Sequence, residues 1–362
     1  MGLKLNVGTI NVPGKIITRS YNMKDLIKLQ RKLIPQVVEL MERRYSILRQ
    51  ISLSEPVGRR TLSNILDISE RIIRSETEFL KEQGLINVAG SGMTISLEGE
   101  KLLDDLKDTM NYVTGLSKLQ DKVKEKLGIK KVLLVPGSFD KNESILHDIA
   151  KCGADYFLQV LKPEDVVSIT GGSTMLEFSK ALKTDKKYNN VTIVPARGSM
   201  GKIVETQTSN IVSIISKKLS SHYKLLNIPD ELSEEAKNSL VQEPEIKRTL
   251  ENIEKTDILV FGIGRADEMA KRRKLSDNKV NEIISKGAVC EAFGYYFNKD
   301  GEIVYKLNTV GIDLNTVNNV RETIAIFGGT TKVEACIAIS KVDKNIVLVT
   351  DEESACKILE SI

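Results

Sequence analysis

The stretch EDVVSITGGSTMLEF (residues 164–178) contains an apolar run that stops at two glycines and two hydroxyl residues, after which a helical pattern begins. Such a run is typical of a buried strand, and Gly171 and Gly172 allow the backbone to approach an anion closely. The N–H groups at the start of the following helix are donors for an anion, and so are the hydroxyls of Ser173 and Thr174. The stretch therefore predicts a strand–loop–helix unit that holds a phosphate.

A second copy of this pattern lies near the C-terminus. GGTTKVE (328–334) shares both glycines, one threonine and the glutamate with GGSTMLE (171–177). Two such loops at one edge of a sheet indicate a ligand with two anionic ends, such as a sugar bisphosphate. Neither loop has the lysine of GxxxxGK[ST], and GIGRAD (262–267) lacks the third glycine of a dinucleotide fingerprint. A nucleotide switch is therefore disfavoured.

The segment after Lys131 alternates between strand and helix signals. Continuous apolar runs separated by helices predict an α/β domain with a doubly wound, mostly parallel sheet that is covered on both faces. Ligands bind such sheets at the C-terminal strand ends. The expected strands are Val132–Val135, Val166–Thr170, Val191–Val194, Tyr223–Ile228, Ile258–Gly262, Ala288–Cys290, Thr323–Phe327 and Ile346–Thr350.

Residues 55–99 predict a winged helix-turn-helix. Two helical runs, 58–66 and 69–83, are joined by a turn that ends on Ser69, a good N-cap residue, and a hairpin over 85–97 follows. In this motif the second helix enters the major groove of DNA. The side chains expected to face DNA are those of Arg59, Arg60, Arg71, Arg74 and Ser75.

The N-terminal region is basic. Residues 1–60 contain 12 lysines and arginines against four acidic residues, although the whole chain carries only +4. This excess favours a polyanionic partner, and a solvated basic helix explains it equally well. The expected organisation is a flexible extension over 1–22, a winged-helix domain over 23–97, a linker helix over 98–128 and an effector domain over 129–362. The first helix is expected over 23–51, with Pro35 as a kink.

Several classes of protein are excluded by composition. No stretch approaches the roughly 20 apolar residues of a membrane helix, and the N-terminus has no signal-peptide pattern. The four cysteines show no CxxC spacing and are expected to be reduced core residues, and two histidines hardly suffice for a histidine metal site. We therefore expect a cytoplasmic protein with no membrane partner, no cofactor and no metal.

Several longer strings resemble the SorC/DeoR family of sugar-binding transcriptional regulators. These strings are EPVGRRTLS (55–63), ISERIIR (68–74), FLKEQGLI (79–86), TGGST (170–174), VPARG (194–198), EAFGYYFN (291–298) and VLVTDE (347–352). The resemblance runs from about Met23 to the C-terminus. It implies a repressor of a glycolytic operon that is released from operator DNA by fructose 1,6-bisphosphate. It also implies a sheet domain similar to sugar-phosphate isomerases and deaminases, without catalytic residues, in a homodimer or homotetramer.

The resemblance also implies an effector site. Gly171, Gly172, Ser173 and Thr174 would cradle one phosphate, with Arg197 and Gln207 nearby. The other phosphate would meet Arg272 and Lys332, and a sugar hydroxyl would meet Glu291. Two alternatives stay open at this point: a sugar-phosphate isomerase or deaminase that carries an accessory DNA module, and an oligomerising DNA binder whose sheet domain is vestigial.

Overall fold

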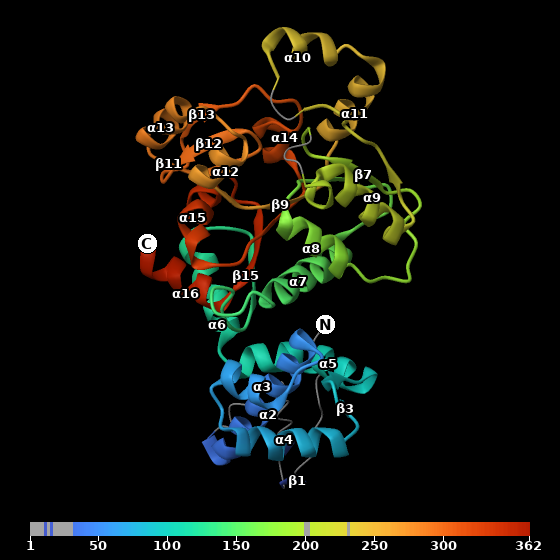
Figure 1. The fold of residues 1–362 in the computed structure, drawn as a ribbon, viewed down its shortest axis with the longest axis vertical. Helices are drawn as coiled ribbons and strands as arrows, with labels where there is room; N and C mark the ends of the chain where they lie inside the picture. Colours follow the sequence, from blue (N-terminus) through green and yellow to red (C-terminus); the bar gives the residue numbers. More distant parts are fainter. Residues whose placement is uncertain (1–10, 13–14, 17–31, 199–202, 230–231) are drawn as a thin grey trace. The chain divides into compact units, whose positions relative to one another are not determined.

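The computed structural model describes residues 11–12, 15–16, 32–198, 203–229 and 232–362, and the chain divides into two compact units, Met1–Lys118 and Leu119–Ile362 (Figure 1). The expected flexible extension over 1–22 lies outside the described residues, except for the two-residue strands β1 (Asn11–Val12) and β2 (Lys15–Ile16). No described helix is long and apolar enough to span a membrane.

The first unit is a winged helix-turn-helix, as the sequence predicts. Its elements are α2 (Pro35–Ser54), α3 (Arg59–Leu66), α4 (Glu70–Glu82), β3 (Ile86–Ala89), β4 (Gly92–Ile95) and α5 (Leu97–Val113). The two strands pair as an antiparallel hairpin, and Val57 adds a bridge to Met93. Side chains from the helices and the hairpin form one apolar core, which includes Ile47, Leu62 and Ile73.

Two local expectations for this unit need correction, and part of a third falls outside the described residues. Pro35 is the first residue of α2 rather than a kink, because proline lacks an N–H and suits the first turn of a helix. Residues 23–31 of the expected first helix lie outside the described residues. Ser69 occupies the N-cap position of α4, but its hydroxyl forms no capping hydrogen bond.

The expected linker helix is two helices. Gly115, with φ +85°, separates α5 from α6 (Leu116–Leu127). The side chains of Val38, Met110 and Val113 pack together, so α5 belongs to the first unit. The backbone conformation at Gly115 is one that L-residues rarely adopt, which explains why the helix does not continue.

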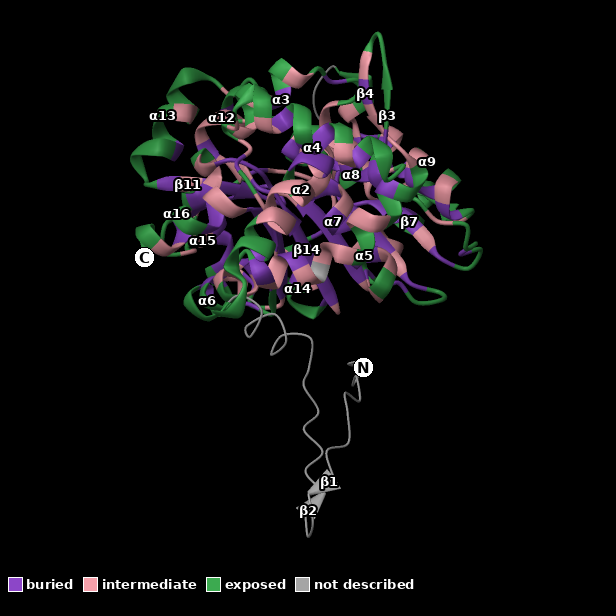
Figure 2. Ribbon diagram, turned by 90° about the horizontal axis from the view of Figure 1, so that it is seen from below, coloured by how far each residue is buried: buried purple, intermediate pink, exposed green. Residues whose placement is uncertain are grey.

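The second unit contains a seven-stranded parallel sheet with the order β5-β15-β14-β9-β6-β7-β8. Strand β14 is buried along its whole length (Figure 2), as a continuous apolar run predicts, and its neighbour β15 is buried in the same way. The strands are β5 (Lys131–Val135), β6 (Val166–Ile169), β7 (Thr192–Pro195), β8 (His222–Tyr223), β9 (Ile258–Gly262), β14 (Glu322–Ile326) and β15 (Ile346–Asp351).

The direction of the crossovers reverses within this sheet. The chain passes from β6 to β7 and β8 at one side and then returns through β9, β14 and β15 towards β5. Right-handed crossovers therefore place helices on both faces, which makes the sheet doubly wound. The helices are α7 (Ile145–Val160), α8 (Ser173–Ala181), α9 (Thr208–Leu219), α10 (Glu234–Leu240), α11 (Pro244–Glu254), α14 (Leu314–Asn319), α15 (Val333–Val342) and α16 (Glu352–Ser361).

Two of the eight expected strands differ from the structure. Of Tyr223–Ile228, only Tyr223 is in a strand, β8, whereas Leu226 and Ile228 are buried in a loop. These two residues are therefore apolar because they are buried, although they form no strand. Ala288–Cys290 lies in a separate antiparallel sheet of β10 (Gly264–Arg265), β11 (Ala288–Ala292), β12 (Tyr295–Asn298) and β13 (Ile303–Lys306). Helices α12 (Ala266–Arg272) and α13 (Asp277–Ser285) pack against it.

The cysteines are all free, as expected, but Cys356 is exposed rather than part of the core. The other three, Cys152, Cys290 and Cys336, are buried. Cys356 lies on the exposed side of α16, so the expectation of a core residue is wrong at this position.

Replacement of Leu62 by alanine should destabilise the first unit, because this side chain is fully buried in the winged-helix core. We expect a loss of about 2–5 kcal/mol in the free energy of unfolding. Hydrogen exchange of the amides of β3 and β4 measures the opening of this unit separately from the sheet unit. Ile65→Ala is the control, because Ile65 lies on the same helix and is 41% exposed. Equal effects of both substitutions would contradict the assignment of the core.

Candidate functional site

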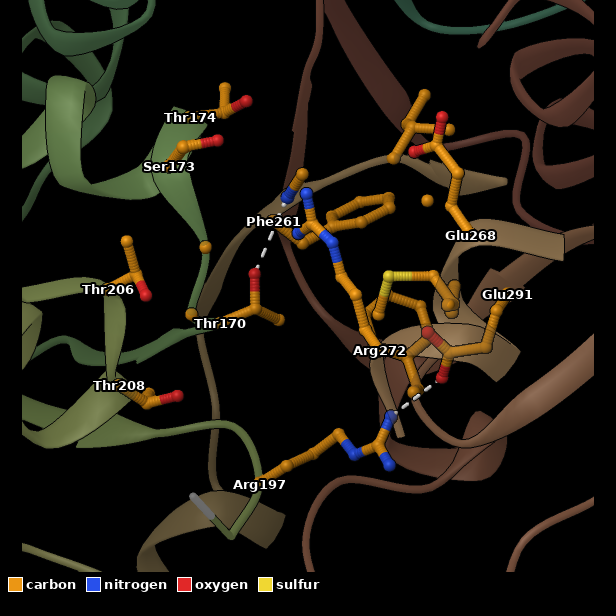
Figure 3. Close-up of a pocket in the computed structure, with 18 of the residues that line it drawn as sticks. Thr170, Ser173, Thr174, Arg197, Thr206, Thr208, Phe261, Glu268, Arg272 and Glu291 are labelled. Carbon is orange, nitrogen blue, oxygen red and sulfur yellow. Dashed lines mark hydrogen bonds and ion pairs between the residues drawn. The ribbon is translucent and has the colours of Figure 1, made fainter. Parts of the chain in front are cut away.

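A cavity of about 400 Å³ opens at the C-terminal edge of the parallel sheet. It lies where the loops after β6 and β9 diverge, at the reversal of the crossovers, which is the ordinary ligand position in doubly wound sheets. Its volume suits a small metabolite. Hydroxyl groups line one side of it (Figure 3), from Thr170, Ser173, Thr174, Thr206 and Thr208.

The loop between β6 and α8 has to be built from glycines. A Cβ atom on Gly171 would lie 2.9 Å from the hydroxyl oxygen of Thr208 and 3.0 Å from the carbonyl oxygen of Thr206. Gly172 has φ +110° and donates its N–H to the Thr206 carbonyl at 2.9 Å. This close approach joins the loop to the start of α9, so the hydroxyls of the two segments face the same cavity. The helix α8 starts here, at Ser173, and its N-terminus contributes positive partial charge.

The second glycine loop, 328–331, does not match the first in its contacts. Gly329 donates its N–H to the carboxylate of Asp351 at 3.0 Å, and Thr330 donates its N–H and its hydroxyl to Asp140 at 2.9 and 2.6 Å. Carboxylates of the protein thus occupy these donors. The two glycine loops are therefore not equivalent anion cradles: none of residues 328–331 lines the cavity, and only Lys332, which follows them, does so.

Glu291 is buried between two arginines. Its Oε1 atom accepts from Arg197 Nη1 at 2.9 Å, from Arg273 Nη2 at 3.0 Å and from the N–H of Gly294 at 2.9 Å. Burial alone would raise the pKa of Glu291, but Arg273, Arg197 and the Gly294 N–H together hold it below its ordinary value. The carboxylate is therefore ionised, and the three side chains carry a net positive charge.

The cavity has an excess of positive charge. Four cationic side chains line it, Arg197, Arg272, Arg273 and Lys332, against the two carboxylates of Glu268 and Glu291. Burial lowers the pKa of Lys332, and the charge of Arg272 lowers it further, whereas Glu268 acts in the opposite direction. Such a charge balance favours an anionic ligand.

The structure brings together most of the predicted effector residues. Those that line the cavity are Gly171, Gly172, Ser173, Thr174, Arg197, Arg272, Glu291 and Lys332. Gln207 is not among the lining residues, although its neighbours Thr206 and Thr208 are. In Figure 3 the Arg272 side chain extends between the hydroxyl side and Glu291. Glu291 itself comes from the second sheet, on β11, rather than from the end of a parallel strand.

Sequence reasoning missed Arg273 and the two threonines. Arg273 belongs to the basic run 271–274, which is typical of a solvated helix face, yet its side chain is only 4% exposed. It follows the last residue of α12, where the helical periodicity that predicts side-chain direction ends. The threonines had a usable signal, because TQTS (206–209) precedes a helical run as GGST does.

A second set of candidate residues lies on the winged helix. Arg60, Arg71, Arg74 and Ser75 are exposed. The side chain of Arg59 is half-buried and donates from Nε to the Thr77 hydroxyl at 3.4 Å.

Part of the basic N-terminal segment has an internal role. Arg44 donates to the buried carboxylate of Glu76 on α4 at 2.8 Å and lies 3.5 Å above the ring centre of Phe79. Arg43 approaches the same carboxylate at 3.4 Å. These two arginines therefore hold α4 against α2, and they account for part of the positive charge that the sequence places in this region.

Comparison with known proteins agrees with this division into two units. The CggR N-terminal DNA-binding domain family matches residues 40–110, and a sugar-binding domain family matches residues 111–360. The central glycolytic genes regulator of Bacillus subtilis is 40% identical, with 93% of this chain and 99% of that protein covered. The protein of the same name from Priestia megaterium is also 40% identical, with 92% and 98% covered.

Solved structures with the same fold include a SorC family transcriptional regulator from Enterococcus faecalis. It is 33% identical, with a TM-score of 0.63, and the match covers 67% of this chain and 99% of that one. The full-length sorbitol operon regulator SorC from Klebsiella pneumoniae has a TM-score of 0.64 at 16% identity over 94% of this chain and 100% of that one. The chain is thus a transcriptional regulator with a DNA-binding and a sugar-binding domain, and it belongs to the SorC family, together with the central glycolytic genes regulators.

Proposed function

We propose that the chain represses a glycolytic operon and that a phosphorylated sugar, fructose 1,6-bisphosphate, relieves its binding to operator DNA. The observation that carries this proposal is the net-positive cavity, in which the N-terminus of α8 and several hydroxyls face Arg272 and Lys332. A bisphosphate places an anion at each of these two sides, and its sugar hydroxyls suit the ionised carboxylate of Glu291. The names of the relatives that are 40% identical support glycolytic genes as the target.

The electrostatics of Glu291 support a sensor over an isomerase or deaminase. A general acid or base works best when its pKa lies near the operating pH. The pKa of Glu291 is held below its ordinary value, and its Oε1 atom already accepts three hydrogen bonds. In this arrangement the carboxylate orients a ligand hydroxyl better than it exchanges a proton.

Relief of operator binding needs two arrangements of the assembly. Helix-turn-helix proteins bind paired half-sites as dimers, so we propose a homodimer or homotetramer. The effector must bind the arrangement with the weaker operator affinity more tightly, because a ligand with equal affinity for both arrangements shifts nothing.

Arg272→Ala should weaken the effector response without weakening the operator complex. The side chain lines the cavity, and loss of a charge-assisted hydrogen bond to phosphate should cost about 1.5–3 kcal/mol, or roughly ten- to hundred-fold in affinity. Calorimetric titration with fructose 1,6-bisphosphate and anisotropy on the chain's own promoter measure the two properties. Lys271→Ala is the matched control, because Lys271 is exposed and does not line the cavity. Unchanged effector affinity in the Arg272 variant would refute the assigned site.

Effector affinity should fall as the pH rises through the lowered pKa of Lys332. The ammonium group is charged below this pKa, and it loses its charge at a lower pH than an ordinary lysine does. Both phosphates of the effector are already fully ionised well above their second pKa of about 6, so they do not account for the change. Calorimetric titrations over a neutral to alkaline series measure the trend. Lys332→Arg should abolish this pH dependence while keeping the charge; a dependence that persists in the variant would assign it to another group.

Arg74→Ala should weaken operator binding and leave effector binding unchanged. An arginine that contacts a base contributes about 1–3 kcal/mol of discrimination, whereas a phosphate contact mainly sets the salt dependence. Anisotropy with the promoter duplex and a scrambled duplex separates these two roles. Lys81→Ala is the control on the same helix, since Lys81 is exposed in its last turn. If both variants bind the operator as tightly as the wild type does, α4 is not the recognition helix.

A further inference from the structure

A group of lysines lies at one corner of the sheet unit, outside the effector cavity. The end of α8, the loop between α8 and β7 and the end of α9 contain six of them, against only two acidic residues, Glu177 and Asp185, in segments 177–188 and 217–219. We call this group the lysine patch, and its members are Lys180, Lys183, Lys186, Lys187, Lys217 and Lys218.

Contacts within the unit make the patch continuous. Helices α8 and α9 pack side by side (Figure 1). Lys218 donates from Nζ to the carbonyl oxygen of Leu182 at 3.0 Å, and the N–H of Tyr188 donates to the carbonyl oxygen of Leu219 at 2.8 Å. Partial burial and the neighbouring charge of Lys183 lower the pKa of Lys218, so the two side chains are close enough to repel one another.

The ammonium groups of only two of these lysines form hydrogen bonds or ion pairs within the described residues, and that of Lys186 lies 5.1 Å from the ring centre of Tyr188. Lys180 pairs with Glu177 at 2.8 Å, and Lys218 satisfies carbonyl groups at the end of α8. The other four, Lys183, Lys186, Lys187 and Lys217, are exposed and form no ion pair with any residue in the described ranges. Crowded like charges repel each other, and a polyanion would relieve this repulsion.

The patch lies at the N-terminal edge of the parallel sheet, opposite the cavity. Its loop leads directly into Thr192, the first residue of β7. Strand β5 also begins at this N-terminal edge, with Lys131, on the opposite flank of the sheet from β7. Lys344 Nζ donates to the Leu127 carbonyl at 3.0 Å and fixes the end of α6, while Lys130 pairs with Glu322, the first residue of β14, at 2.8 Å.

We propose that the lysine patch binds the phosphate backbone of duplex DNA that flanks the operator. Lysine is a flexible point charge that suits phosphates of any sequence, because it needs no fixed geometry. The patch would thus add affinity without adding base recognition. The proposal goes beyond the effector response, and it rests on the proposed function only in that the chain binds an operator.

The test is the full-length triple variant Lys183→Gln, Lys186→Gln, Lys187→Gln, with effector absent. Its affinity is measured over a salt series on two duplexes: the promoter segment that the triple variant itself protects, cut to that length, and the same segment with flanking DNA. The matched control is Lys286→Gln, Lys299→Gln, Lys357→Gln, which removes the same charge from exposed positions elsewhere on the sheet unit. Thermal unfolding of each variant verifies that it is folded.

On the long duplex, the plot of log binding constant against log salt concentration should be less steep for the patch variant, by about 0.9 for each phosphate that the protein no longer neutralises. The affinity of the patch variant for this duplex should also be lower than that of the wild type. On the short duplex, the patch and control variants should match the wild type. The proposal is overturned if the patch variant and the control have the same affinity and salt dependence on the long duplex, which is the result expected of a patch that binds an acidic protein. It is also overturned if the patch variant loses the same factor in affinity on both duplexes. Failure of the proposed function has a different signature, since the wild type would then not prefer the promoter over a scrambled duplex of equal length.

Discussion

The effector cavity depends on one buried ion cluster, in which Glu291 lies between Arg197 and Arg273. Arg197 follows β7 of the parallel sheet, Arg273 follows α12, and Glu291 is on β11 of the antiparallel sheet. The cluster therefore joins the end of β7 in the parallel sheet to two segments that come much later in the chain. Removing one member of such a buried group leaves an uncompensated charge and typically costs about 3–5 kcal/mol, so each of the three side chains needs the other two.

The cavity is asymmetric, although the sequence suggests a symmetric pair of glycine loops. The loop at 171–174 directs its helix N-terminus into the cavity, whereas Asp140 and Asp351 occupy donors of the loop at 328–331. One side thus presents backbone dipoles and hydroxyls to the cavity, and the lining also includes the side chains of Arg272 and Lys332. A bisphosphate that spans both sides would join the β6–α8 loop to the segment after β14, which is the kind of differential contact that a ligand-driven shift requires.

The most regular elements were predictable. The central strands β6, β9, β14 and β15 are buried on both faces, and this environment produces the continuous apolar runs that predict them. The winged helix was predictable because its amphipathic helices, turn and hairpin are all local patterns. Predictions failed where a buried apolar residue does not belong to a strand of the parallel sheet. Leu226 and Ile228 are apolar because they are buried in a loop, and Ala288–Cys290 is part of a strand in the antiparallel sheet.

The sequence by itself determined the two-unit organisation, the parallel sheet, the outward arginines of α4 and the strand–glycine loop–helix unit at 166–181, because each follows from periodicity or from the chemistry of adjacent residues. The tertiary structure alone decided which arginine of the run 271–274 turns inward, which glycine loop faces the cavity and which carboxylates occupy the other. These outcomes depend on segments separated by many residues, as in the pairing of Thr330 with Asp140 and of Arg197 with Glu291. A local pattern holds no information about such partners, because burial and charge neutralisation are set only when the chain has folded.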